Sequence, residues 1–196
     1  IGEANRSFYR QHGVSTERIF STPYCIDNAR FVADADRVRP DRSHLKEKFG
    51  LSKEAFTFLY CGKFEQKKRP MDLLLALKSM IEAGNTSAQL LMVGDGELKA
   101  DCEKMAQREN LPVKFSGFLN QREIIDAYVA SDCLVLASDY GETWGLVVNE
   151  AMACGLPAIV SNQSGCHLDL IFNRETGYVY QMGIIQQLSY RLLTVA

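Results

Sequence analysis

From residue 56 onward, short apolar runs alternate with longer amphipathic segments, and this alternation restricts the possible folds more than any other feature. Nearly continuous apolar runs are typical of strands buried on both faces, and the segments between them have the length of helices. Strands that each precede a helix predict an α/β fold, a doubly wound Rossmann-like parallel sheet covered on both faces. The expected strands lie at 56–62, 88–94, 113–117, 132–138, 157–161 and 177–181, and the expected helices at 70–84, 97–110, 120–131, 145–155 and 164–172.

The first 55 residues follow a different pattern. They are rich in turn formers and charged residues, and they hold one short strand candidate at 19–21. We expect this part to contribute little core and to be the tail of another unit. At the other end, "GIIQQLSYRLLTVA" stops within an apolar helical pattern that has no cap or stop signal. Both ends look cut, so we expect a fragment of a longer protein.

Composition excludes several classes of protein. The 196 residues are 46% hydrophobic with a formal net charge of −2, which suffices for a core but lacks the basic excess of a nucleic-acid binder. No stretch reaches the roughly 20 apolar residues of a membrane span. The six cysteines form no CxxC pair and the three histidines have no ligand spacing, so we expect buried thiols and no metal site. We expect a cytoplasmic location, and peripheral membrane association stays open.

Ligands of open parallel sheets bind at the carboxyl ends of the strands, and four loops at such positions carry suitable residues. In "GKFEQKKRP", Lys63 and Lys68 lie beside Gly62 within a basic run that suits a phosphate, although a solvated basic turn is the commoner explanation. In "VGDGEL", Gly94 and Gly96 let backbone approach a ligand, and a plain strand-to-helix turn explains them about as well.

The third loop, "SGFLN", places Phe118 and Leu119 after the strand, where they could form a slot for a flat base or simply pack into the core. The fourth is "GETWGLVVNE", in which Glu142 lies in a loop and Gly145 begins a helix. Glu150 is then roughly 7 Å along the helix axis from that start. The free N–H groups of a helix N-terminus suit a diphosphate, and flanking carboxylates suit vicinal hydroxyls. The alternative is a helix-face Glu150 paired with a Lys or Arg.

Taken together, the four motifs resemble those of the C-terminal domain of GT-B fold retaining glycosyltransferases of glycosyltransferase family 4, over about residues 56–180. "GETWGLVVNEAMACGLPAIVS" is similar to the E-x7-E segment of that family, and "GKFEQKK" is similar to its basic loop. "LLMVGDGEL" and "VKFSGFL" are similar to its phosphate- and base-side loops. "FSTPYCIDNARF" is similar to the stretch that leaves the N-terminal domain. Residues 1–45 would then be the end of that domain and a linker, and residues 46–196 a nucleotide-sugar-binding domain, truncated before its C-terminal end.

The resemblance implies roles for individual residues. Glu142 would bind hydroxyls of the donor sugar and Glu150 the ribose diol, while Lys63 and Lys68 would contact the diphosphate. We therefore expect Lys63, Lys68 and Glu142 to be the catalytic residues. The remaining donor-binding positions would be Gly62, Gly94 and Gly96, Phe118 and Leu119 at the base, and the backbone of Trp144, Gly145 and Leu146 at the phosphates.

The implied reaction transfers a sugar from a nucleoside diphosphate sugar to an acceptor hydroxyl with retention, without a metal or other cofactor. The acceptor, a glycan, lipid or small molecule, would bind the absent N-terminal domain, so we expect the fragment to bind the donor without turnover. Four departures from the family pattern concern the identity of the sugar: Lys63 stands for Arg, Ala137 for Pro and Trp144 for Phe, and the loop before Glu142 is one residue longer. The alternatives are an NAD-type Rossmann oxidoreductase domain, which lacks its glycine fingerprint here, and a non-catalytic nucleotide-binding or regulatory module.

Overall fold

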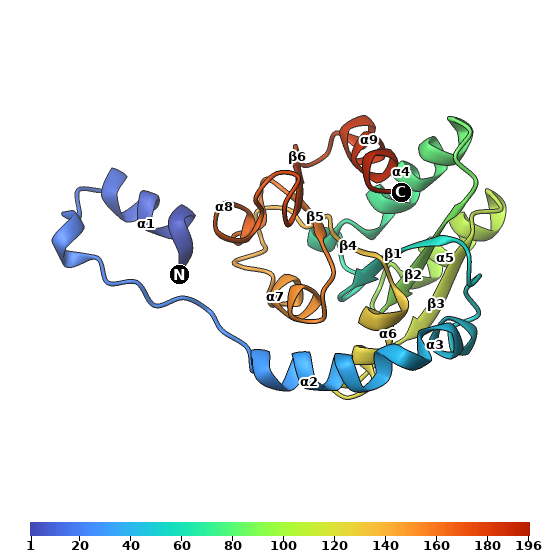
Figure 1. Cartoon of the computed structure of the whole chain (residues 1–196). Coiled ribbons are helices and arrows are strands. Elements are labelled where there is room, and N and C mark those ends of the chain that lie inside the picture. The colour runs from blue at the N-terminus through green and yellow to red at the C-terminus, as the bar shows by residue number, and fades with distance from the viewer.

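The computed structural model describes residues 1–196 and consists of a six-stranded parallel sheet between two layers of helices (Figure 1). All neighbouring strands are parallel, in the order β3-β2-β1-β4-β5-β6. This arrangement confirms the predicted α/β fold. The order reverses between β1 and β4, which is where doubly wound sheets bind ligands. The strands are β1 (Phe56–Cys61), β2 (Ala88–Val93), β3 (Val113–Gly117), β4 (Cys133–Leu136), β5 (Ala158–Ser161) and β6 (Gly177–Tyr180).

The two faces of the sheet carry separate apolar cores, because side chains alternate along each strand. In β1, Phe58 and Tyr60 join the core on one face, whereas Leu59 joins the core on the other. The first core lies under α4 (Pro70–Glu82), α5 (Lys99–Arg108) and α9 (Ile185–Val195). The second lies under α6 (Ile124–Ala130), α7 (Leu146–Ala153) and α8 (His167–Leu170), together with two helices from the first 50 residues.

Those two helices, α2 (Asn28–Val38) and α3 (Arg42–Lys48), correct an expectation drawn from the sequence. They pack on α6 and α7 along one side of the sheet (Figure 1) and bury Phe31, Ala35 and Leu45 in the second core. The prediction that the first 55 residues contribute little core is therefore wrong for this part. Its apolar positions are sparse among charges, and their burial depends on the surface that α6 and α7 offer.

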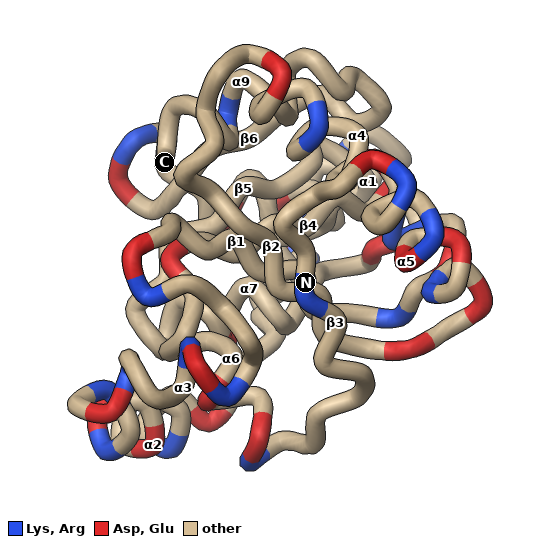
Figure 2. The backbone as a smooth tube through the Cα atoms, turned by 90° about the vertical axis from the view of Figure 1, so that its right-hand side faces the viewer, with Lys and Arg blue, Asp and Glu red and all other residues tan.

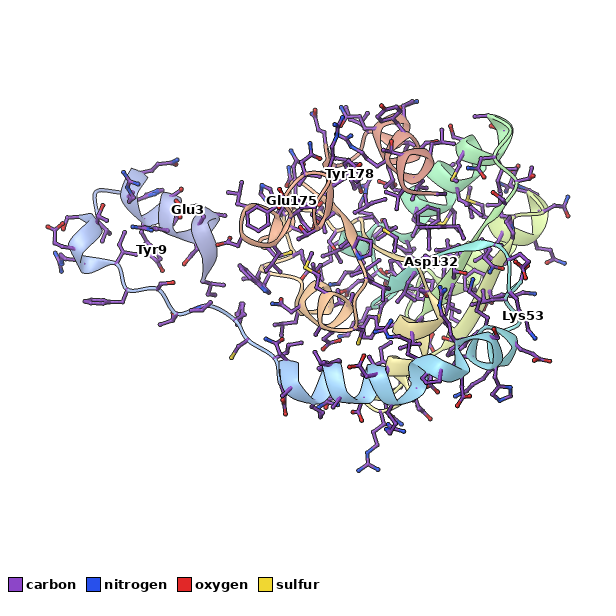
Figure 3. All side chains as sticks on the ribbon, in the orientation of Figure 1. Glu3, Tyr9, Lys53, Asp132, Glu175 and Tyr178 are labelled. Atoms are coloured by element: carbon purple, nitrogen blue, oxygen red, sulfur yellow. The ribbon has the colours of Figure 1, made fainter.

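Residues 1–27 do match the expectation, since none of them is buried. They contain α1 (Gly2–Gln11), a 3₁₀ turn η1 (Thr16–Arg18) and a long extended connection that lies away from the sheet (Figure 1). The strand predicted at 19–21 is wrong, because this extended stretch pairs with no other strand. The N-terminus of α1 is held to α8 by Asp169, whose two carboxylate oxygens accept from the backbone N–H of Glu3 (Figure 3).

A charged cluster at the amino ends of β1 and β4 fastens α3 to the sheet. Asp132, labelled in Figure 3, accepts from Arg42 at 2.6 Å and from the backbone N–H of Thr57 at 2.9 Å. Lys46 lies 3.7 Å from the same carboxylate, and its side chain is 5% exposed. Its ammonium also donates to two backbone carbonyls of the α3–β1 connection, at 3.1 and 2.9 Å. Burial lowers the pKa of Lys46, while Asp132 opposes that shift.

The surface carries charged residues of both signs (Figure 2). Basic and acidic residues alternate over the backbone trace (Figure 2), in keeping with the net charge of −2. Two further 3₁₀ turns lie in connections: η2 (Arg39–Asp41) joins α2 to α3, and η3 (Gln66–Lys68) lies between β1 and α4. None of the helices combines the length and the apolarity that crossing a bilayer requires.

Candidate functional site

The four loops singled out in the sequence meet at the carboxyl edge of the sheet. Backbone hydrogen bonds tie each to the next: Gly62 N–H donates to Val93 at 3.0 Å, and Gly94 N–H donates to Gly117 at 2.9 Å. The loop after β4 joins them through a bond of 2.8 Å from the N–H of Asp139 to the carbonyl of Lys67. The loops therefore form one connected rim on both sides of the switch point.

A cavity of about 570 Å³ opens between the loops after β1, β2 and β3. This volume is in the range of small-molecule sites, roughly 300–1,000 Å³. Phe118 is 77% exposed at this cavity, so core packing does not explain it, whereas Leu119 also packs against the second core. Six of the nine lining residues were predicted from the sequence. The nine are Cys61, Gly62, Lys63, Val93, Gly94, Asp95, Gly96, Phe118 and Leu119.

The glycines of the loop after β2 are required by the close passage of two backbones. Gly94 has φ +131°, and a Cβ atom there would lie 1.9 Å from the carbonyl oxygen of Gly62. Gly96 has φ +151°, and a Cβ atom there would lie 2.6 Å from the carbonyl oxygen of Phe64. Both contacts are far inside van der Waals distance, so these glycines let the β1 and β2 loops pack against each other and shape the cavity.

Glu142 is held in the β4–α7 loop by a lysine and a serine. Its Oε2 atom accepts a hydrogen bond from the ammonium of Lys68 and another, at 3.1 Å, from the hydroxyl of Ser138. The side chains of Lys68 and Glu142 are 18% and 13% exposed, so the pair is partly screened from solvent. Oε1 of Glu142 has no protein partner and is not among the buried unpaired atoms. The carboxylate therefore keeps one reachable acceptor oxygen.

The basic run after β1 divides into cations at the site and cations paired elsewhere. Lys68 contacts Glu142, and Lys63 lines the cavity with an exposed side chain. Lys67 instead pairs with Glu65 at 3.5 Å. Arg69 is bound to Asp72 at the start of α4. The interpretation as a solvated basic turn thus fits Lys67, while two lysines face the place where a ligand would lie.

The N-terminus of α7 offers unpaired backbone donors between the two glutamates. The N–H groups of Trp144, Gly145 and Leu146 donate to no protein acceptor. Gly145 has φ +99°, a left-handed conformation that suits glycine at this helix start. The indole of Trp144 is buried and donates to Asn149 at 2.8 Å, so only its backbone is available at the site. Such a helix start carries partial positive charge and suits an anion.

Glu150 lies within α7. Its Oε2 atom accepts a hydrogen bond of 2.7 Å from the hydroxyl of Tyr128. It takes part in no ion pair, so the alternative of a Lys or Arg partner is wrong. Burial and then the charge of Glu150 raise the pKa of the Cys61 thiol to about 12. Oε1 of Glu150, like that of Glu142, is neither paired nor buried.

The structure adds residues that the sequence reading missed. Tyr128 and Ser138 each donate to one of the glutamates, and Cys61 and Asp95 line the cavity. A signal existed for Tyr128, because a tyrosine within the apolar face of a helix needs a partner for its hydroxyl. None existed for Ser138, whose role depends on the path of the β4–α7 loop. No group of three His, Cys, Asp or Glu side chains is arranged to hold a metal ion.

Comparison with known protein families identifies the family to which this chain is similar. The family model described as "Glycosyl transferases group 1" matches residues 41–195. Most of the chain is thus covered, including all four loops of the site. The match begins within η2, so it takes in α3 and Lys46 as well as the sheet. It also separates the chain from nicotinamide-dependent oxidoreductases, the alternative that shares the same sheet architecture.

Curated relatives agree with the family match. A GDP-mannose-dependent alpha-(1-6)-phosphatidylinositol dimannoside mannosyltransferase of Mycobacterium tuberculosis is 36% identical over 106 residues, 54% of this chain and 27% of the relative. A UDP-Gal:alpha-D-GlcNAc-diphosphoundecaprenol alpha-1,3-galactosyltransferase of Escherichia coli is 31% identical over 187 residues, 93% of this chain and 48% of the relative. The chain spans less than half the length of these relatives.

Solved structures show the same fold. A glycosyltransferase from Rickettsia africae superposes with a TM-score of 0.80 at 18% identity, covering 96% of this chain and 51% of the other. Anabaena Alr3699/HepE in complex with UDP superposes with a TM-score of 0.77 at 21% identity, covering 97% of this chain and 51% of the other. The six-stranded α/β fold is therefore that of GT-B glycosyltransferases.

Proposed function

The chain belongs to the glycosyl transferases group 1 family, and from this premise we propose that it is the donor-binding part of a retaining glycosyltransferase of the family 4 type. The proposed donor is a nucleoside diphosphate sugar. The observation that carries this proposal is the arrangement of two glutamates around the N-terminus of α7. Each glutamate is held by a protein donor on Oε2 and keeps Oε1 free.

In the proposed complex the donor lies along this row of groups. Hydroxyls of the sugar donate to Oε1 of Glu142, and the ribose diol donates to Oε1 of Glu150. The diphosphate lies between them, within reach of Lys68, Lys63 and the free N–H groups at the start of α7. The base enters the cavity of about 570 Å³ that Phe118 and Leu119 border. Each chemical part of the donor thus meets a matching set of protein groups.

The proposed chemistry follows from where charge develops. As the bond between the anomeric carbon and the diphosphate oxygen breaks, negative charge grows on the departing nucleoside diphosphate. The ammonium groups of Lys63 and Lys68 and the dipole of α7 stabilise that charge, in the place that a metal ion takes in other transferases. The anomeric carbon then bonds to the acceptor hydroxyl oxygen with its configuration retained, and the hydroxyl proton passes to the departing diphosphate. In this assignment the glutamates orient the donor and do not act as an acid–base pair.

The acceptor is proposed to bind a preceding domain, to which residues 1–45 would connect. The chain by itself would then bind the donor without turning it over. Titrating the 196-residue chain with a nucleotide sugar and assaying transfer to water or to added acceptors tests both statements. Transfer at a rate comparable to a complete glycosyltransferase would contradict the proposed division of labour.

The nucleotide can be UDP, GDP or ADP under this proposal, and binding experiments decide among them. A ligand that binds the native state raises its stability by RT ln(1 + [L]/Kd), about 2.7 kcal/mol at 100 times Kd. We expect one of the three nucleotides and its sugar derivative to raise the melting temperature of the chain. Glu150→Ala should lower that nucleotide's affinity about tenfold or more, since it removes an acceptor of charged hydrogen bonds.

The matched control is Glu97→Ala, which removes an exposed carboxylate near the cavity that lies outside its lining and makes no ion pair. It should leave nucleotide affinity unchanged. Failure of UDP, GDP and ADP to bind the wild-type chain would overturn the proposed function. Equal affinities in the wild type and Glu150→Ala would show that the ribose does not lie at α7.

A further inference from the structure

Tyr128 is the buried donor on which the orientation of Glu150 depends. Its side chain is fully buried at the end of α6, 22 residues before Glu150 in the chain, and its hydroxyl lies 2.7 Å from Oε2 of that carboxylate. Tyr128 is the sole protein side chain that donates to Glu150. A carboxylate has two oxygens, so this bond decides which of them is left for a ligand.

The hydrogen-bond donor to Glu150 is neutral, which distinguishes this carboxylate from that of Glu142. Burial raises the pKa of Tyr128 well above its ordinary value, and burial raises the pKa of Cys61 to about 12. Both groups therefore keep their protons, and the tyrosine hydroxyl can only donate toward the carboxylate. Glu142, in contrast, is bound by the ammonium of Lys68. No cation competes with a ligand for the free oxygen of Glu150.

The position of Tyr128 is itself constrained by packing. Its ring lies against Phe31 of α2, with ring centroids 6.5 Å apart and an interplanar angle of 62°. Both rings belong to the second core, in which α2 packs on α6 and α7. A buried ring with a fixed neighbour cannot swing its hydroxyl away from Glu150 without opening a cavity. The hydrogen bond is thus pre-formed and is made without a ligand.

From these contacts we infer that Tyr128 is a positioning residue for ribose: by occupying Oε2 of Glu150, it leaves Oε1 for the ribose and makes the site prefer ribonucleotides to 2′-deoxyribonucleotides. The inference rests on the proposed ribose-binding role of Glu150. Tyr128 does not touch the donor and acts through the carboxylate. Cys61, which ends β1, lines the cavity, and α7, which carries Glu150, begins at the same carboxyl edge of the sheet.

The test compares UDP with 2′-deoxy-UDP, or the corresponding GDP or ADP pair if the wild type binds that nucleotide instead. Isothermal titration of the 196-residue chain should show about tenfold tighter binding of the ribonucleotide, the effect of one hydrogen bond to a charged group. In Tyr128→Phe, which keeps the ring against Phe31, ribonucleotide affinity should fall about fivefold to tenfold. In this variant the ratio of the ribonucleotide affinity to the deoxyribonucleotide affinity should fall toward one.

The matched control is Tyr180→Phe. Tyr180 is also buried, at the end of β6, but its hydroxyl has no hydrogen-bond partner. The same atom is removed in both variants, so a general effect of losing a buried hydroxyl appears in both. We expect Tyr180→Phe to keep the affinity and the ribose preference of the wild type.

A second measurement separates positioning from a general structural effect. If Tyr128 acts through Glu150, then Tyr128→Phe has no further effect on nucleotide affinity in a Glu150→Ala background. An equal loss in both backgrounds, or an unchanged ribose preference in Tyr128→Phe, would overturn the inference while leaving the proposed function in place. If the wild type binds none of the six nucleotides, the proposed function fails and the inference fails with it.

Discussion

The two ends of the sheet both hold partly buried carboxylates, but their oxygens are hydrogen-bonded to different extents. At the amino ends of the strands, Asp132 has both oxygens occupied, by Arg42 and by the backbone N–H of Thr57. At the carboxyl ends, Glu142 and Glu150 each have one oxygen occupied and one free. A fully satisfied buried charge holds structure together, whereas a half-satisfied one keeps capacity for a ligand. Four sets of variants test this difference between the two ends.

The largest effect is expected from breaking the amino-end cluster. Asp132→Ala leaves the buried ammonium of Lys46 without its counter-charge and removes the acceptor of Thr57 N–H. We expect a loss of about 3 kcal/mol in the free energy of unfolding, measured by urea denaturation. Nucleotide affinity of the folded fraction should not change, because the cluster is at the opposite edge of the sheet.

An exposed acidic residue provides the comparison. Asp36 pairs with Arg39 at 3.6 Å, with side chains 68% and 47% exposed, and Asp36→Ala should cost less than about 0.5 kcal/mol. If Asp132→Ala cost no more than Asp36→Ala, the amino-end cluster would not be structural and the contrast between the ends would fail.

A smaller effect, acting on both stability and binding, is expected at Gly165. A Cβ atom there would lie 1.9 Å from the carbonyl oxygen of Thr143, in the loop that leads into α7. Gly165→Ala should therefore displace that loop, with about 2 kcal/mol of destabilisation in urea and at least about a tenfold loss of nucleotide affinity by titration. Gly13→Ala serves as the control for affinity: nothing lies within 4 Å of its Cβ position, and the backbone strain expected at its φ of +83° is confined to the turn after α1. It should leave affinity unchanged.

Removing the lysine at the carboxyl end should affect binding more than stability. Lys68→Met removes the ammonium beside Glu142 and keeps the length of the side chain. We expect nucleotide affinity to fall about tenfold, or about 1.4 kcal/mol. The free energy of unfolding should fall by no more than about 1 kcal/mol, because Glu142 keeps the hydrogen bond from Ser138 and its second oxygen is not buried. Lys67→Met, at an exposed neighbour paired with Glu65, should change affinity far less. A large stability loss in Lys68→Met would mean that this end is structural too.

The smallest effect concerns the pH dependence of stability. Burial raises the pKa of Cys133, at the amino end, and of Cys61, at the carboxyl end, to about 12 each. Because the folded pKa exceeds the unfolded one, this contribution is fully present below about pH 8.5 and is lost as pH rises toward 12. At one pH unit above the pKa of the unfolded thiol, each thiol should lower the free energy of unfolding by about 1 kcal/mol. Cys133→Ala should reduce the loss of unfolding free energy with rising pH, measured by urea denaturation at several pH values. Cys25→Ala, which changes an exposed thiol, should not.

Much of the fold was predictable from the sequence because strand and helix periods are local properties. All six strands and the helices from residue 70 onward lie where the apolar pattern placed them, with shifts at the ends. Helix α6 shows the limit: it was expected from residue 120 and begins at Ile124, because Asn120 and Glu123 cap the preceding turn. The core role of Phe31 and Ala35 was not predictable, because two apolar residues four apart identify a helix face but not its partner.

The site divides in the same way. The residue pattern alone predicted that the four loops lie together, since a parallel sheet places the carboxyl ends of its strands at one edge whatever the details of packing. It also determined that two carboxylates flank a helix start, because their spacing along the chain is covalent. The partners of these side chains depend on the three-dimensional packing: Lys68 and Ser138 hold Glu142, Tyr128 holds Glu150, and Lys67 and Arg69 pair elsewhere. Those contacts join residues up to 74 positions apart, and hydrogen bonds at that separation depend on how the layers pack, which no local pattern encodes.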